Sequence, residues 1–92
     1  GWMGLDVKPV PSKGGSALLV KATSAGGPAA KAGVLPGDTI THFNKQAIVD
    51  GRLTMQQIAQ MRPGDIIDIQ LQRNEQPMSL QAIIGERPSN SG

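Results

Sequence analysis

Near the end of the chain, two segments alternate apolar and polar residues with the period of a β-strand. The apolar positions of these two segments are Ile67, Ile69, Leu71, Met78, Leu80, Ala82 and Ile84. Residues 74–77 read Asn-Glu-Gln-Pro, a composition that favours a turn. The pattern predicts a hairpin with one buried face and one wet face. Because the chain has 92 residues, that apolar face must be buried inside one small domain.

Three further strands are expected at residues 3–10, 17–23 and 39–43, with loop-forming residues between them. Proline has no backbone N–H to donate to a neighbouring strand. Pro9 and Pro11 are therefore expected to limit regular pairing at the far end of the first strand.

Two helices are expected between the strands. Pro28 at a first helical position and Gly33 just past the end predict a short helix over residues 28–32. Asp50 is expected to cap a longer helix that runs to about Met61. The resulting order of elements, without regular alternation of strand and helix, indicates an α+β domain with a mostly antiparallel sheet.

The residue types exclude several kinds of chemistry. The absence of cysteine excludes disulfides, thiolate metal sites and cysteine nucleophiles. His42 is the only histidine and is expected to be an ordinary strand residue, while Asp65 and Asp68 fall on opposite faces of their strand. We therefore expect no catalytic residue, no metal site and no cofactor.

The charges are balanced and dispersed. Nine Lys and Arg residues against seven Asp and Glu residues give a net charge of +2, and the basic residues form no run. Nucleic-acid readers normally cluster their basic residues on one face, so no nucleic-acid partner is expected. No apolar run approaches the ~20 residues that span a bilayer. The chain starts directly with a strand-like segment, so no signal peptide is expected either.

Three motifs in a fixed order point to a known family. Residues 28–34 read Pro-Ala-Ala-Lys-Ala-Gly-Val, residues 36–40 read Pro-Gly-Asp-Thr-Ile, and Phe43-Asn44 follows. Together they resemble the signature of PDZ domains, although Lys45 stands where that family usually has glycine, which leaves the turn type open. The resemblance implies a PDZ-like, partly open antiparallel β-sandwich or barrel of about five to six strands, with one short and one longer helix. It covers nearly the whole chain, so we expect a PDZ domain over residues 1–88 and a flexible tail over 89–92.

The opening run Trp2-Met3-Gly4-Leu5 resembles the start of the circularly permuted PDZ domains of bacterial HtrA-type serine proteases. This resemblance implies a non-catalytic regulatory domain that binds exposed C-terminal peptides of misfolded or unfolded outer-membrane proteins. It would thereby control a protease domain in the same polypeptide during envelope stress. The resemblance also implies a periplasmic parent protein, with or without an inner-membrane anchor, that is a homotrimer through its protease domains. The isolated domain is expected to be monomeric.

Two other interpretations stay open from the sequence. One is a scaffold PDZ domain of another envelope system, such as a secretion component or an intramembrane metalloprotease. The other is an enzyme in its own right, which would have to rely on His42 and scattered serines.

PDZ-type recognition adds the ligand as a strand to a sheet edge. A glycine lets the backbone curl into a nest of N–H groups that binds an anion, and we expect the terminal carboxylate to be held in this way by Met3, Gly4 and Leu5. Helical residues three and four apart share a face and could form the opposite wall of the groove. The expected site comprises the carboxylate loop Trp2, Met3, Gly4 and Leu5, the strand edge Asp6, Val7 and Lys8, and the helix residues Arg52, Met55, Gln56 and Ala59.

Within that site, Met55 is expected to line the pocket for the last ligand side chain, because a flexible thioether suits varied apolar groups. The small Ala59 is expected to leave room for an aromatic terminal residue. The competing structural interpretations are that Trp2 caps the core, that Met55 fills it, and that Gly4 is an ordinary turn glycine.

Overall fold

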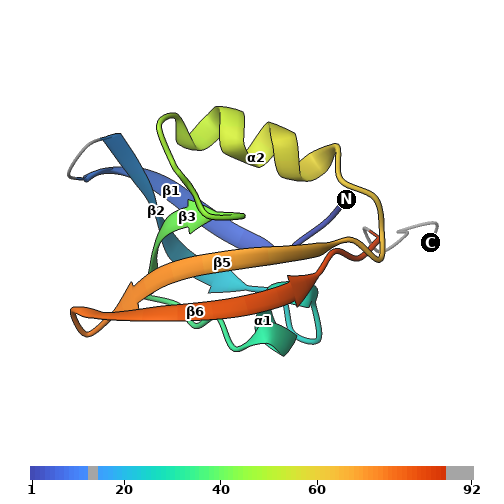
Figure 1. Cartoon of the computed structure of the whole chain (residues 1–92). Coiled ribbons are helices and arrows are strands. Elements are labelled where there is room, and N and C mark those ends of the chain that lie inside the picture. The colour runs from blue at the N-terminus through green and yellow to red at the C-terminus, as the bar shows by residue number, and fades with distance from the viewer. Residues whose placement is uncertain (13–14, 87–92) are drawn as a thin grey trace.

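The computed structural model describes residues 1–12 and 15–86, which form one antiparallel sheet and two helices (Figure 1). The expected tail over 89–92 and part of the predicted loop before the second strand lie outside the described residues. The elements are β1 (Leu5–Ser12), β2 (Gly15–Thr23), α1 (Pro28–Ala32), β3 (Thr39–Phe43), β4 (Gln46–Ala47), α2 (Gly51–Ala59), β5 (Ile66–Arg73) and β6 (Gln76–Ile83). The expected PDZ-like α+β fold, with five to six antiparallel strands and two helices, is confirmed.

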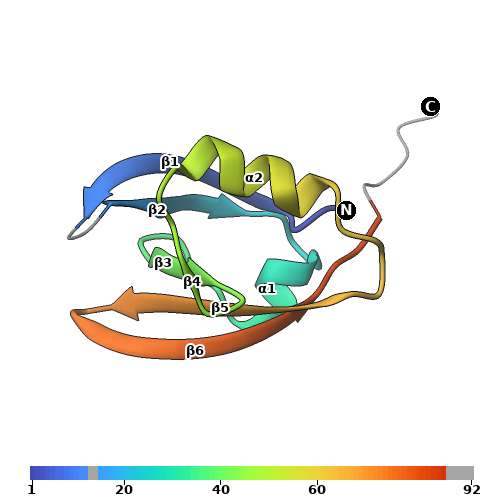
Figure 2. The same cartoon turned by 45° about the horizontal axis from the view of Figure 1, so that its top comes forward.

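The strand order is β1-β2-β3-β5-β6, with the short β4 paired to β3. β1 and β6 are therefore the two edges of the sheet. Figure 1 shows α2 on one side of the molecule, over β1, and α1 on the other side, beside β6. In Figure 2 the start of the chain lies beside the last turn of α2, where the Gly1 amino group donates to the Ala59 carbonyl.

The core is almost entirely aliphatic. The predicted face of the β5–β6 hairpin is buried at Ile67, Ile69 and Leu71 on β5, at Ala82 on β6, and at Ile84 just after β6. The other buried apolar residues are Met3, Ala17, Leu18, Val20, Ala29, Val34, Ile40, Phe43, Ile48 and Ile58. Sheet and helices thus share one core, and Met3 joins the expected carboxylate loop to it.

The turns follow local backbone chemistry. Asn44 and Lys45 both have positive φ, at 51° and 67°, so a non-glycine residue occupies the second turn position. Asn74 and Glu75 repeat this geometry between β5 and β6, which makes that turn shorter than the predicted 74–77. Two-residue hairpins favour such turns because their twist matches that of the strands.

Several predicted boundaries are wrong. β1 begins at Leu5 rather than at residue 3, because Gly4 has a left-handed φ of 69° that breaks the extended backbone. Helix α2 begins as predicted, with the Asp50 carboxylate accepting from two backbone N–H groups, but it ends at Ala59. The two-residue strand β4 was not predicted, because so short a segment carries no periodic signal.

The expectation that two prolines limit pairing of the first strand is also wrong. Pro9 pairs with Leu18 and Pro11 with Ser16, so the β1–β2 ladder continues to the end of β1. A proline fits an edge strand when its missing N–H lies on the side away from the neighbour, and β1 is such an edge.

One ion pair holds the segment between α1 and β3 against β5. The side chain of Asp38 is 2% exposed and accepts from Arg73 Nε at 2.9 Å and from an Arg73 terminal nitrogen at 2.7 Å. The same Arg73 nitrogen donates to the Gly33 carbonyl at 2.8 Å, and the Leu35 N–H donates to Asp38 at 2.9 Å. The hydrogen bond from Arg73 lowers the pKa of Asp38 below its ordinary value, burial opposes this, and the Leu35 N–H assists it.

We predict that Arg73→Met lowers the free energy of unfolding by about 2–3 kcal/mol at neutral pH, because it strips a buried carboxylate of its partner. The folded pKa of Asp38 is depressed, so the pair stabilises the protein above the unfolded pKa of about 3.9. That contribution is lost as the pH falls through the lower folded pKa. The difference between Arg73→Met and wild type, measured by urea unfolding from pH 7 to pH 3, should therefore shrink below about pH 4.

Arg62→Met is the matched control, because Arg62 is exposed and its side chain forms no ion pair among the described residues. It should change the free energy of unfolding by less than about 0.5 kcal/mol. An equal loss of stability in both variants, or a difference independent of pH, would contradict the role given to the Asp38–Arg73 pair.

Candidate functional site

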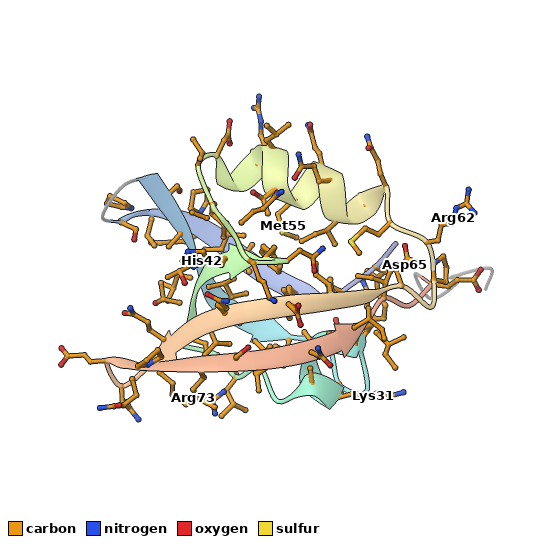
Figure 3. The ribbon with its side chains drawn as sticks, in the orientation of Figure 1. Lys31, His42, Met55, Arg62, Asp65 and Arg73 are labelled. Atoms are coloured by element: carbon orange, nitrogen blue, oxygen red, sulfur yellow. The ribbon has the colours of Figure 1, made fainter. Side chains whose placement is uncertain are left out.

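A pocket of about 240 Å³ lies between the first residues of the chain and the second half of α2. Figure 3 shows Met55 on the side of α2 that faces the strands. The residues that line the pocket are Gly1, Trp2, Met3, Gly4, Leu5, Met55, Ile58 and Ala59. The structure thus brings the predicted carboxylate loop together with two of the four predicted helix residues.

The carbonyl groups of residues 2–4 are each bonded to a different part of the fold. The Trp2 carbonyl accepts from the Gly85 N–H after β6 at 3.0 Å. The Met3 carbonyl accepts from the Ala29 N–H in α1 at 2.9 Å, and the Gly4 carbonyl accepts from the Ser24 N–H after β2 at 2.9 Å. The N–H groups in the first turn of a helix have no partner within the helix, so Ala29 is a free donor that the loop uses. Three elements therefore fix the orientation of three successive peptide planes.

This anchoring sets the direction of the N–H groups of Met3, Gly4 and Leu5. In a planar trans peptide the C=O of one residue and the N–H of the next point in opposite directions, and the described residues contain no cis peptide. Because the three carbonyls point into the fold, the three following N–H groups point away from it. Among the described residues, no backbone carbonyl accepts from Met3 or Gly4. Successive N–H groups turned to one side form an anion-binding nest.

Gly4 supplies the curvature of this loop. Its φ of 69° lies in the left-handed region, which glycine adopts without a steric penalty. A Cβ at this position would lie 3.3 Å from the Ser24 Cβ and 3.3 Å from the indole of Trp2. Both its φ and its surroundings therefore favour glycine at position 4.

Trp2 stabilises the loop through backbone hydrogen bonds and through its indole ring. Its N–H and C=O are both bonded to Gly85, at 2.9 and 3.0 Å. Its ring lies close to Gly4 and Gly27, where an added Cβ would come within 3.3 Å of the indole in each case. The side chain is half-buried and also lines the pocket, so Trp2 holds the loop in place while its own N–H is already occupied.

The outer edge of β1 offers the backbone groups of Leu5 and Val7. The bond from the Ser24 N–H to the Gly4 carbonyl makes Leu5–Thr23 a non-hydrogen-bonded pair of the β1–β2 ladder, so the Leu5 N–H and C=O face outward. Alternation along the strand places Val7 outward as well. Asp6 and Lys8, which the sequence analysis counted as part of this edge, direct their backbone groups toward β2, and their side chains are exposed.

The helix wall differs from the predicted one. Met55 and Ala59 line the pocket, but Arg52 and Gln56 are exposed and do not. The reason is the rotation of α2, whose buried residues are Gly51 and Ile58. Ile58 was not among the expected site residues, but it is buried and lines the pocket together with Met55 and Ala59.

His42 has a simple structural environment. It is half-buried on β3, and its Nδ1 lies 2.8 Å from the Thr41 hydroxyl. That hydroxyl donates to the Gln70 carbonyl at 3.3 Å. No carboxylate orients the imidazole among residues 1–12 and 15–86, so the geometry lends no support to an acid–base role.

No group of three or more His, Asp or Glu side chains suited to a metal ion occurs within the described part of the chain. The helices described there are all too short to cross a bilayer.

Comparison with known proteins places this site in a family context. A family model described as PDZ domain matches residues 1–84. The chain is 30% identical over 93 residues to the serine endoprotease DegS of Escherichia coli K12, covering 96% of this chain and 26% of that protein. It is 31% identical over 100 residues to a probable periplasmic serine endoprotease, DegP-like, of Rhizobium meliloti, covering 99% of this chain and 20% of the relative. The chain thus spans about a quarter of the length of these relatives.

Solved structures agree with the sequence relatives. The HtrA-type protease AlgW with a decapeptide superposes with a TM-score of 0.85 and 38% identity, over 97% of this chain and 30% of AlgW. AlgW with a tripeptide gives a TM-score of 0.82 and 39% identity, over 100% of this chain and 33% of AlgW. The resemblance to the PDZ domains of HtrA-type proteases is confirmed, and DegS is one of the relatives.

A substitution at Gly4 should disturb the loop in two ways, through the left-handed backbone and through contacts of the added Cβ. Gly4→Ala and Gly26→Ala both place an L-residue at a positive φ, 69° and 73°, but a Cβ on Gly26 meets nothing within 4 Å. We expect each variant to lose about 1–2 kcal/mol of unfolding free energy from the left-handed backbone. Only Gly4→Ala should also broaden or shift the NMR amide resonances of Met3 and Leu5.

The two-dimensional NMR spectrum of the 15N-labelled domain measures this difference. Identical perturbation of residues 3–5 by both substitutions would contradict the close packing of Gly4 against Trp2 and Ser24.

Proposed function

Because the chain belongs to the PDZ domain family, we propose that it binds the free carboxyl terminus of a peptide between the 3–5 loop and α2. Two observations support this: the anchored carbonyls direct the N–H groups of Met3, Gly4 and Leu5 away from the fold, and the same three residues line the pocket. A carboxylate accepting several backbone N–H bonds needs no basic side chain. The relatives named AlgW were solved with a tripeptide and with a decapeptide, which supports a peptide as the ligand.

The pocket beside the loop indicates an apolar terminal side chain. Leu5, Met55, Ile58 and Ala59 contribute apolar atoms to its wall, and its volume is about 240 Å³. Met55 can adjust to different shapes because it is unbranched and flexible, and Ala59 leaves space above the floor. The rest of the peptide would extend along β1 as an added strand, which is how exposed sheet edges bind extended segments.

In the parent protein, we propose, this binding regulates an attached serine protease domain. The relatives are named serine endoproteases, one of them periplasmic, and this chain matches a fraction of their length that leaves room for such a domain. The proposed natural ligands are C-termini of unfolded outer-membrane proteins in the periplasm, and the proposed output is envelope-stress signalling. A trimeric parent with or without an inner-membrane anchor fits the same proposal.

The carboxylate mechanism predicts a strong preference for a free acid. A short peptide that ends in phenylalanine should bind with an affinity on the order of micromolar. Its C-terminal amide should bind at least about tenfold more weakly, because it loses a charge-assisted set of hydrogen bonds. Trp2 is the only tryptophan and lines the pocket, so its fluorescence should report the titration.

Equal affinities for the acid and the amide would contradict the proposed carboxylate loop. Absence of binding for every free-acid peptide, with a folded partner captured instead, would favour the scaffold interpretation.

The shape of the pocket predicts a selective effect of filling it. Ala59→Leu adds bulk to the wall and should weaken a phenylalanine-ended peptide about tenfold by overpacking, while an alanine-ended peptide should lose less than about threefold. Gln56→Leu is the matched control, because Gln56 is exposed one turn away and does not line the pocket. Calorimetric titration measures both, and an equal effect of the two substitutions would contradict the assigned helix face.

A further inference from the structure

The outer edge of β1 changes its hydrogen-bonding character along its length. Beyond Val7, the next residues of the same phase are Pro9 and Pro11. Their phase follows from their partners on β2. Ser16, opposite Pro11, donates its N–H to Ile48, so its backbone groups face away from β1.

The β2 residues opposite the middle of β1 also direct their backbone groups away from β1. Val20, opposite Val7, donates its N–H to the Asp38 carbonyl and accepts from the Gly37 N–H, both on the side away from β1. Leu18, opposite Pro9, lies two residues from both Val20 and Ser16 and pairs with Ile40 on β3. These pairs are therefore the non-hydrogen-bonded pairs of the β1–β2 ladder, and their β1 members face outward.

The outward edge thus has N–H donors only at its first two positions. Leu5 and Val7 offer both an N–H and a C=O, whereas Pro9 and Pro11 offer a C=O alone. We propose that Pro9 and Pro11 end the peptide-binding ladder, so that the domain reads only about the last three residues of its ligand through backbone pairing. This inference rests on the proposed carboxyl-terminal binding and defines its length.

The register of an added antiparallel strand gives the residue count. With the terminal carboxylate on the 3–5 loop, the last ligand residue donates its N–H to the Leu5 carbonyl. The outward residues of β1 are met by ligand residues two apart, so the third-from-last residue exchanges both bonds with Val7. The fifth-from-last residue can donate to the Pro9 carbonyl but receives no N–H in return, and the seventh meets the same gap at Pro11.

The position of α2 supports the same limit. At its first residue, a Cβ on Gly51 would lie 2.6 Å from Leu18 Cδ2 and 3.6 Å from the Pro9 Cβ. The first residue of α2 therefore packs directly against Leu18 of β2 and Pro9 of β1. The pocket lies at the other end of α2, among residues 1–5 and 55–59. A pocket thus lies beside the carboxylate loop, whereas the helix packs against β1 where the N–H donors stop.

A series of peptides of different length tests this limit. N-acetylated peptides of three, five and eight residues that share their last three residues should bind the wild-type domain with affinities within about threefold of one another. An increase of more than about tenfold from three to eight residues would overturn the length limit while leaving carboxyl-terminal binding intact. Failure of all three free acids to bind would overturn both proposals.

Restoring a donor should extend the ladder in a position-specific way. Pro9→Val should strengthen binding of the five- and eight-residue peptides about three- to tenfold, the value of one added hydrogen bond, and leave the three-residue peptide unchanged within about twofold. Pro11→Val is the matched control, because it should affect only the eight-residue peptide. Calorimetry and sedimentation of each variant measure affinity and confirm a monomer. Equal gains for all three peptides, or none for any, would overturn the role of the prolines.

Discussion

The carbonyl groups of residues 2–4 are each tied by a hydrogen bond to a different part of the fold, and the rest of the site depends on those bonds. The partners are the ends of β2 and β6 and the first turn of α1. Because a peptide plane is rigid, fixing each carbonyl also fixes the next N–H. The loop therefore presents its donors already oriented, which reduces the entropy that a ligand must overcome on binding. Buried Met3 and half-buried Trp2 keep the loop against the core.

The anchors of the loop are themselves held by more distant contacts. Ala29 lies in α1, and the segment that follows α1 is tied to β5 by the Asp38–Arg73 ion pair and to β2 by the bonds between Val20 and residues 37–38. The ion pair is costly to bury, but every oxygen of Asp38 has a donor, which is the condition under which such a pair is tolerated. The ion pair lies at the hairpin end of β5, away from the pocket. It contributes to the site indirectly, because it fixes the position of α1, which anchors the loop through Ala29.

Elements with a local sequence signal could be predicted from the sequence. Features that depend on how elements pack against one another could not. The alternation at Ile67, Ile69 and Leu71 predicted the buried face of β5, and Asp50 predicted the start of α2 through its side-chain cap. Neither periodicity nor capping gives the rotation of a helix about its axis. Met55 and Ala59 line the pocket, whereas the exposed Arg52 and Gln56, which had been grouped with them, do not.

The phase of β1 was missed for a similar reason, although one signal was present. A proline inside a paired strand must direct its missing N–H away from the partner, so the spacing of Pro9 and Pro11 already indicates which residues face outward. Counting back by twos gives Val7 and Leu5, not Lys8 and Asp6. Pro9 and Pro11 were expected only to limit pairing, whereas on an edge strand their spacing shows which residues face outward.

An edge strand that binds peptides faces two opposing requirements. It must offer N–H and C=O groups to the ligand, yet the same groups invite pairing with any other exposed strand, and natural sheets usually block such edges with proline, charge or a bulge. β1 divides the two tasks along its length. The donors of Leu5 and Val7 stand beside the 3–5 loop, whose N–H groups are proposed to select a chain end over an internal segment. Pro9 and Pro11 stand beyond Val7, at positions where a strand without a free terminus could otherwise pair with the edge. In the proposed function, selectivity for a free terminus would therefore arise both from the N–H groups missing after Val7 and from the N–H groups of the 3–5 loop.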